Sequence, residues 1–293
     1  FNGEFLQPVT MAKLTPDQNM TLQVGDLSFN AGSDFTARTQ QINPEINIDG
    51  SDVVFVGYGI NAPEYNWDDF ADIDVKDKTI IVLVNDPGFA TQDDALFTGN
   101  AMTYYGRWTY KYEEGARQGA KAVFIVHETA PAAYPWGVVE SSNTGSKYTL
   151  IDQDKNASDI PVMGWIDEQA ANEIFAQAGL DYQTEKANAL KADFKPVDLK
   201  AKAALTLKSD ISQAQSHNVV ATLKGSETPD EYIVIGAHWD HFGTKQTDDG
   251  VKIYNGAVDN ASGSAATVEI ARILTEMHKK KPFKRSIIFA NFT

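Results

Sequence analysis

The chain has 293 residues, 42% of them hydrophobic, which is enough for two domains of ordinary size with separate cores. Acidic residues outnumber basic ones by 40 to 25, and the net charge of −15 disfavours nucleic acid or anionic lipid as a partner, because both require a positive surface. The lack of cysteine excludes disulfides and thiolate metal ligands. No apolar run reaches the roughly 18 residues of a membrane span.

The chain up to residue 223 consists of short apolar runs separated by turn residues. Residues 1–45 alternate polar and apolar positions weakly, which predicts a few half-exposed strands. Residues 181–198 are polar and contain Pro196, so we expect a connector there. The remaining pattern predicts strands at residues 53–56, 79–84, 122–126, 161–166, 199–207 and 219–223, and helices at residues 104–118 and 167–178.

The carboxyl-terminal part has a strand, loop, helix, strand order. Tyr232 to Ile235 form a continuous apolar run, which predicts a strand buried on both faces. A long loop and a helix over residues 261–278 follow, and a strand is predicted at residues 286–292. The predicted inner face of the helix carries Ala266, Ile270, Ile273, Leu274 and Met277. This order implies parallel strands joined by a right-handed crossover, so both carboxyl ends lie at one edge of the sheet.

Three side chains near that edge have the chemistry of a metal site. His238 and Asp240 follow the apolar strand, and Asp259 lies on a turn bounded by Gly256 and Gly263. A divalent ion in a hydrolase needs imidazole and carboxylate ligands with one position open to water. The alternative is that His238 is an ordinary strand-end histidine and that Asp259 with its neighbour only caps the helix. The three residues together favour the metal site.

The same residues carry a resemblance to a known family. The run from Ile235 to His241, IGAHWDH, and the run from Gly256 to Gly263, GAVDNASG, resemble the start of the catalytic domain of M28-family zinc aminopeptidases. Motifs at residues 55–63, 67–70 and 74–78 resemble the protease-associated (PA) domain that is inserted in many members.

The resemblance implies an α/β protein in which a mixed sheet with helices forms part of an M28-like zinc-peptidase domain, with an inserted β-rich PA domain. Residues 1–48 would be strands that belong to the peptidase domain or pack on it. Residues 49–197 would form the PA-like domain, and residues 198–293 the amino-terminal, incomplete portion of the catalytic domain.

The resemblance also implies a site with two zinc ions. His238 would bind one ion, and Asp259 would bridge both. Asp240 would orient His238, and it is the residue that we assign to catalysis. In the family, paired glutamates after the next strand supply the general base and a further ligand, and an Asp and a His complete the site. None of these is expected within the present 293 residues, so zinc binding should be weak or absent and the chain inactive as a fragment.

The implied function of the parent protein is a zinc-dependent aminopeptidase that releases amino-terminal residues from peptide substrates. Two alternatives are a carboxypeptidase or dipeptidase on the same scaffold and a non-catalytic protein that binds partners through the PA domain. The chain opens at Phe1 rather than Met, which fits a processed periplasmic or extracellular protein.

Three other features have simpler interpretations. His241 lies close to Asp240 in sequence, and we expect it to be exposed; His127 ends an apolar strand and is predicted to be a hydrogen-bonded histidine at the edge of the core. The aromatic loop around Tyr134 and Trp136 either packs internally or forms part of a binding surface.

Overall fold

The computed structural model describes residues 4–247 and 249–293 and divides into two compact units. The larger unit is Ala12–Gln213, and the smaller one combines the described part of Phe1–Met11 with Ala214–Thr293. These limits differ from the expected boundaries after residues 48 and 197. The reason is strand pairing, because β2 (Thr21–Val24) and β5 (Glu45–Phe55) both pair with the first part of the 27-residue strand β12 (Val197–Leu223).

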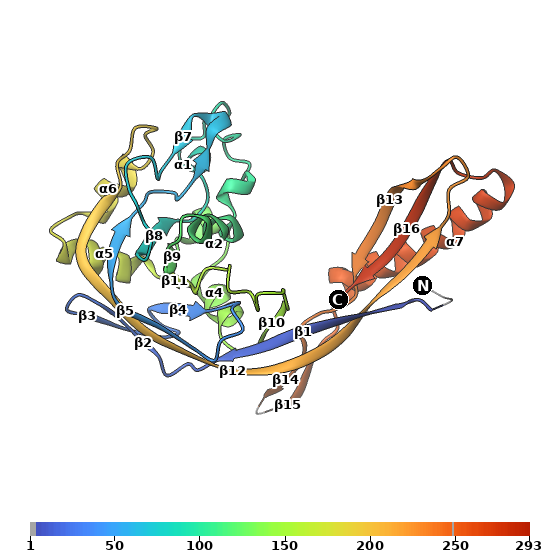
Figure 1. Cartoon of the computed structure of the whole chain (residues 1–293), viewed down its shortest axis with the longest axis horizontal. Helices are drawn as coiled ribbons and strands as arrows, with labels where there is room; N and C mark the ends of the chain where they lie inside the picture. The colour runs from blue at the N-terminus through green and yellow to red at the C-terminus, as the bar shows by residue number, and fades with distance from the viewer. Residues whose placement is uncertain (1–3, 248) are drawn as a thin grey trace. The chain divides into compact units, whose positions relative to one another are not determined.

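The centre of the larger unit is a parallel sheet (Figure 1). Its neighbouring strands are, in order, β5 (Glu45–Phe55), β8 (Thr79–Leu83), β9 (Ala122–Val126) and β11 (Val162–Ile166). On its two sides, β4 (Phe35–Arg38) pairs antiparallel with β11, and β12 pairs antiparallel with β5. β8, β9 and β11 lie at the predicted positions. β5 begins at Glu45, well before the strand predicted at residues 53–56, and residues 199–207 and 219–223 belong to one continuous strand.

Both faces of this sheet are covered. Alternate residues of the central strands belong to two separate apolar clusters, with Ile81 and Phe124 in one and Ile80 and Val123 in the other. Since successive strand residues point to opposite faces, the clusters are the two faces of the sheet. Helices α5 (Glu168–Gln177) and α6 (Tyr182–Asn188) contribute to the first cluster, and α4 (Trp136–Asn143) contributes to the second.

Two helices form where the sequence predicted a loop and a connector. Helix α6 lies inside the expected connector because Asp181 caps it, accepting a hydrogen bond from the backbone N–H of Thr184 at 2.8 Å. Helix α4 starts directly after Pro135, whose φ of −75° suits a helix start. The predicted helix at 104–118 is shorter, with a 3₁₀ turn at Tyr104–Gly106 followed by α2 (Trp108–Arg117).

The other short elements of this unit complete the chain trace. They are β1 (Leu6–Pro16), which continues into the smaller unit, β2 (Thr21–Val24), β3 (Leu27–Asn30), β6 (Asn61–Ala62), β7 (Trp67–Asp68), a 3₁₀ turn at Pro63–Tyr65, α1 (Pro87–Thr91), α3 (Thr129–Ala132) and β10 (Lys147–Leu150).

The smaller unit has the predicted crossover. Strands β13 (Thr228–His238) and β16 (Arg285–Phe292) are parallel and are joined through α7 (Ser262–Lys280), while β16 also pairs antiparallel with the last part of β12. A hairpin of β14 (Gly243–Thr247) and β15 (Gly250–Tyr254) occupies the predicted long loop. Within residues 4–247 and 249–293, no helix combines the length and apolarity needed to cross a membrane.

Burial in the smaller unit differs from the prediction. Tyr232 and Val234, expected to be buried on both faces, are more than half exposed, because β16 is the only described strand that pairs with β13. Helix α7 turns Thr267 inward, whereas Ile273 and Met277 of the predicted inner face are exposed. The described strands β13 and β16 contact the side of α7 that carries Thr267, so only Leu274 of the predicted inner face is half-buried.

Residues of the motifs at 55–63 and 67–70 are held by buried polar contacts. The carboxylate of Asp69 accepts hydrogen bonds from the backbone N–H of Ile60 and the indole N–H of Trp67, both at 2.9 Å. The buried Lys111 ammonium on α2 donates to the carbonyls of Tyr58 and Asn85 at 2.7 and 2.9 Å, and burial lowers its pKa to about 7. Buried backbone groups at the ends of strands thereby gain partners.

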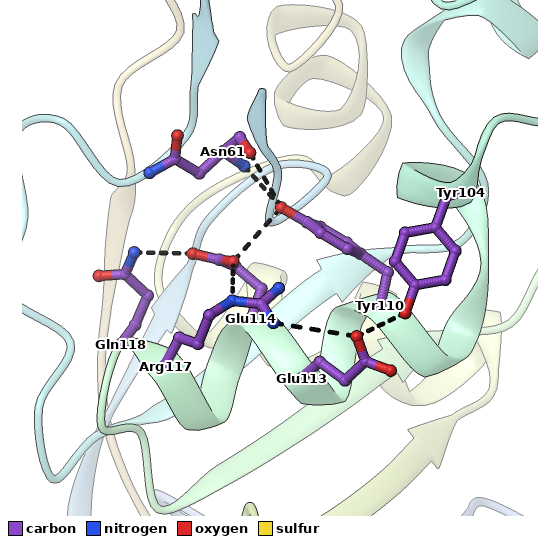
Figure 2. A network of polar contacts seen from close by, with 7 residues as sticks. All are labelled: Asn61, Tyr104, Tyr110, Glu113, Glu114, Arg117 and Gln118. Atoms are coloured by element: carbon purple, nitrogen blue, oxygen red, sulfur yellow. Dashed lines mark hydrogen bonds and ion pairs between the residues drawn. The ribbon is translucent and has the colours of Figure 1, made fainter. Parts of the chain in front are cut away.

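A second polar network ties α2 to β6 (Figure 2). The carboxylate of Glu114, which is only 5% exposed, accepts from Arg117 Nε at 2.7 Å and Gln118 Nε2 at 2.8 Å, and lies 3.3 Å from the hydroxyl of Tyr110. That hydroxyl also bonds to both backbone groups of Asn61 at 3.1 Å. Glu114 is therefore the buried centre of the network.

Replacing this centre should destabilise the larger unit. We expect Glu114→Ala to lower its free energy of unfolding by about 1–3 kcal/mol, because a buried acceptor is removed and its donors lose their partner. Chemical denaturation followed by circular dichroism measures the change. The neighbouring Glu113→Ala is the matched control, since Glu113 is exposed. An equal loss of unfolding free energy in both variants would show that the burial of Glu114 adds no stability.

Candidate metal centre

His238 is the last residue of β13, and hydrogen bonds fix the backbone around it. Its carbonyl accepts from the hydroxyl of Ser264 on α7 at 3.0 Å. The backbone N–H of Trp239 donates to the carbonyl of Phe292 at 2.8 Å, and the Trp239 indole donates to the carbonyl of His217 at 3.0 Å. The strand end is thus held by α7, β16 and β12, which positions the imidazole at the carboxyl edge of the sheet.

Asp259 lies in an irregular turn, Ala257–Ala261, that precedes α7. Its φ and ψ of −115° and 92° are not helical, and the Asp259–Asn260 peptide bond is cis. Gly256 has a positive φ of 60°, and a Cβ there would lie 2.7 Å from the carbonyl oxygen of Asp259. The backbone conformation and the close contact both require glycine at this position.

Helix capping falls to Asn260 and not to Asp259. The side-chain oxygen of Asn260 accepts from the backbone N–H of Gly263 at 3.0 Å, and a Cβ on Gly263 would come within 2.2 Å of that oxygen. The carboxylate of Asp259 contacts His238 instead. Helix capping therefore explains the presence of Asn260 and Gly263. It does not explain Asp259, whose carboxylate has a different partner.

The three candidate side chains converge. Nε2 of His238 lies 2.8 Å from Oδ1 of Asp259, and Nδ1 lies 3.3 Å from Oδ1 of Asp240 and 3.1 Å from the Asp240 carbonyl. The His238, Asp240 and Asp259 side chains are 42%, 56% and 77% exposed, respectively. One imidazole is therefore held between two carboxylates in contact with water.

The electrostatics of this group follow from its contacts. The hydrogen bond to the Asp240 carbonyl is the main cause that raises the pKa of His238 above its ordinary value; desolvation opposes it, and the hydrogen bond and charge of Asp259 add to it. Ion pairs this exposed contribute little to stability. The arrangement is thus better explained by the chemistry of its donor atoms than by stabilisation of the fold.

These donors suit zinc in kind. A neutral imidazole nitrogen and carboxylate oxygens are ordinary zinc ligands, and a carbonyl or carboxylate on the far nitrogen is the usual way to orient such a histidine. The number of ligands is too small for a complete zinc site, because residues 4–247 and 249–293 contain no group of three or more His, Cys, Asp or Glu side chains arranged to hold a metal. Structural and catalytic zinc sites use three or four protein ligands.

His127 and His241 have the simpler roles that the sequence predicted. His127 is buried and bonds through Nε2 to the carbonyl of Tyr134 at 2.9 Å, as predicted for the edge of the core. His241 is exposed, and its Nδ1 bonds to the carbonyl of Tyr254 at 3.0 Å. The anchoring role of Ser264 was not predicted; its position in the first turn of α7 was the available signal.

Comparison with known proteins finds similarity in the part of the chain that carries this site. Residues 218–293, which include all three candidate residues, match the model of Peptidase family M28. A "Probable zinc metalloprotease" of Pyrenophora teres f. teres (strain 0-1) is 45% identical over 78 residues, covering 25% of this chain and 15% of that protein. "Aminopeptidase NAALADL1" of Rattus norvegicus is 37% identical over 79 residues, covering 26% of this chain and 9% of its own.

The chain therefore spans less than a sixth of the length of these two curated relatives. Among solved structures, an aminopeptidase from Aneurinibacillus sp. strain AM-1 has 21% identity and a TM-score of 0.42, with 98% of this chain and 52% of that chain covered. The matched segment begins in β12 and contains β13, α7 and β16. The similarity to Peptidase family M28 thus covers residues 218–293, which we call the M28 segment.

Proposed function

We propose that this chain is part of a zinc-dependent aminopeptidase that removes amino-terminal residues from peptides. The observation that carries the proposal is the 2.8 Å approach of His238 Nε2 to Asp259 Oδ1, within the segment that matches the M28 model. An imidazole nitrogen and a carboxylate directed at each other from a strand end and a helix-start turn are two donors for one cation.

Each residue has a distinct role in this proposal. His238 and Asp259 would hold zinc through an imidazole nitrogen and carboxylate oxygens. Asp240 is a positioning residue, because its contacts with Nδ1 direct Nε2 toward Asp259. Zinc, when bound, supplies activation of a water molecule and polarisation of the scissile carbonyl.

The 293 residues alone should not be active. Within residues 4–247 and 249–293, His238 and Asp259 are the two direct zinc donors, whereas a catalytic site needs three protein ligands and a carboxylate that takes the proton from water. We propose that the remaining ligands and the general base come from elsewhere in the whole protein. Residues 49–197 would form an inserted PA domain that shapes access to the site.

Zinc binding by the 293-residue chain tests the ligand count. We expect a dissociation constant weaker than about 1 μM by competition with a chromogenic chelator, because two ligands give far less binding energy than a complete site. His238→Gln should weaken it further, and Asp249→Asn, at an exposed acid of the same unit, should not. Stoichiometric zinc that survives dialysis, together with peptidase activity, would refute the two-ligand assignment.

The role of Asp240 is tested in the whole protein. Asp240→Asn should lower zinc affinity or kcat/KM by about 10–100-fold, the usual cost of losing a residue that orients a metal-bound histidine. The prediction is checked by measuring zinc content and kcat/KM in the same preparations, with Asp249→Asn as the matched control. Unchanged values in Asp240→Asn would remove this residue from the site.

The class of peptidase is tested with paired substrates. We expect the whole protein to hydrolyse leucine p-nitroanilide, to lose this activity with a zinc chelator and to regain it with zinc. The N-acetylated substrate should react at least about 100-fold more slowly, because an aminopeptidase must recognise a free amino group. Cleavage of N-acetylated peptides at a free carboxyl terminus would instead indicate a carboxypeptidase, and no hydrolysis of either kind would favour a binding protein.

A further inference from the structure

A cavity of about 370 Å³ lies in the larger unit, remote in sequence from the M28 segment. It is bounded by the end of β4, the start of α2, helix α4 and strand β10. Its lining combines two cations, Arg38 and Lys147, with four aromatic side chains, Trp108, Tyr134, Tyr148 and Trp165. No Asp or Glu is among the described residues that line it.

Arg38 is the buried cation of this pocket. Only 9% of it is exposed, its Nε donates to Oδ1 of Asn143 at 3.1 Å, and its guanidinium carbon lies 6.0 Å from the ring centre of Trp108. Burial lowers the pKa of Arg38, and burial together with the charge of Arg38 lowers the pKa of Lys147. Two like charges therefore face one pocket, and neither pairs with a carboxylate among the described residues.

This arrangement costs free energy unless an anion completes it. A buried charge is ordinarily paired, and an unpaired one is expensive to desolvate. The chain does not lack acids, since it has 40 of them for 25 basic residues. The polar contact that Arg38 does make, to the neutral Asn143, orients the guanidinium without neutralising it.

The mouth of the pocket is apolar and accessible. Trp108, Val138 and Tyr148 are 38%, 42% and 56% exposed and lie around the cations. A concave site with apolar walls and few convergent polar groups is typical of small-ligand binding. The guanidinium fork matches a carboxylate, and flat aromatic side chains accept a ring by stacking.

We propose that this pocket binds a small aromatic carboxylate, with the carboxylate between Arg38 and Lys147 and the aromatic group against Trp108 and Tyr148. The carboxylate belongs either to a free acid or to the carboxyl terminus of a peptide, since both present the same groups. The inference does not depend on the peptidase assignment, because every residue involved lies in Ala12–Gln213.

Calorimetric titration of the 293-residue protein tests the proposal with matched ligands. N-acetylphenylalanine should bind at least about tenfold more tightly than N-acetylphenylalanine amide, which has the same ring but no carboxylate. N-acetyl-Gly-Gly-Phe distinguishes the source. Tighter binding of this peptide assigns the site to peptide termini, and equal or weaker binding assigns it to free acids.

Variants locate the binding in the pocket. Lys147→Gln, at a half-buried position, should weaken N-acetylphenylalanine binding about three- to tenfold, and Arg38→Gln should weaken it more; the matched control Lys76→Gln, at an exposed position of the same unit, should not. Circular dichroism establishes that each variant is folded, and Lys147→Gln carries the test if Arg38→Gln is not. Equal affinity for acid and amide, no binding of either at millimolar concentration, or equal effects of Lys147→Gln and Lys76→Gln would overturn the proposal.

Discussion

The parallel pairing of β13 with β16 is the constraint on which the candidate metal centre depends. Parallel strands need a crossover, and α7 provides it, so the chain must leave β13 and re-enter α7 at the same edge of the sheet. His238 ends the strand and Asp259 lies in the turn before the helix. The order in which the strands and the helix are connected, more than side-chain packing, brings His238 Nε2 within 2.8 Å of Asp259 Oδ1.

The two units use their apolar residues differently. In the larger unit, alternate residues of the central strands belong to two clusters, so both faces of the sheet are buried. In the smaller unit, Tyr232 and Val234 on β13 and Met277 on α7 are exposed, although their sequence pattern is that of a core. An apolar surface of this kind is typical of a contact face. Here it lies within the M28 segment, which is consistent with our proposal that the whole protein supplies the rest of the site.

Buried polar groups in the larger unit fall into two kinds. Lys111 and Glu114 have several hydrogen-bond partners each and connect the helix to strand ends and turns, so a structural role accounts for them. Arg38 has one neutral partner and faces a cavity. The difference in partners, at similar burial, is the physical reason to assign a ligand to Arg38 and not to the other two.

The sequence by itself predicted the strands β8, β9 and β11, the crossover, and the closeness of His238, Asp240 and Asp259 at one sheet edge. Each of these depends on contacts local in the chain or on a strand order that allows few connections. Residues 122–126, for example, form the predicted strand without a shift. Only the tertiary structure decided which side of α7 is covered, that β12 is continuous, and that Arg38 meets Asn143, which is 105 residues away in sequence. Burial and pairing between distant segments depend on which surfaces face each other in space, and a linear pattern of apolar and polar residues does not contain that information.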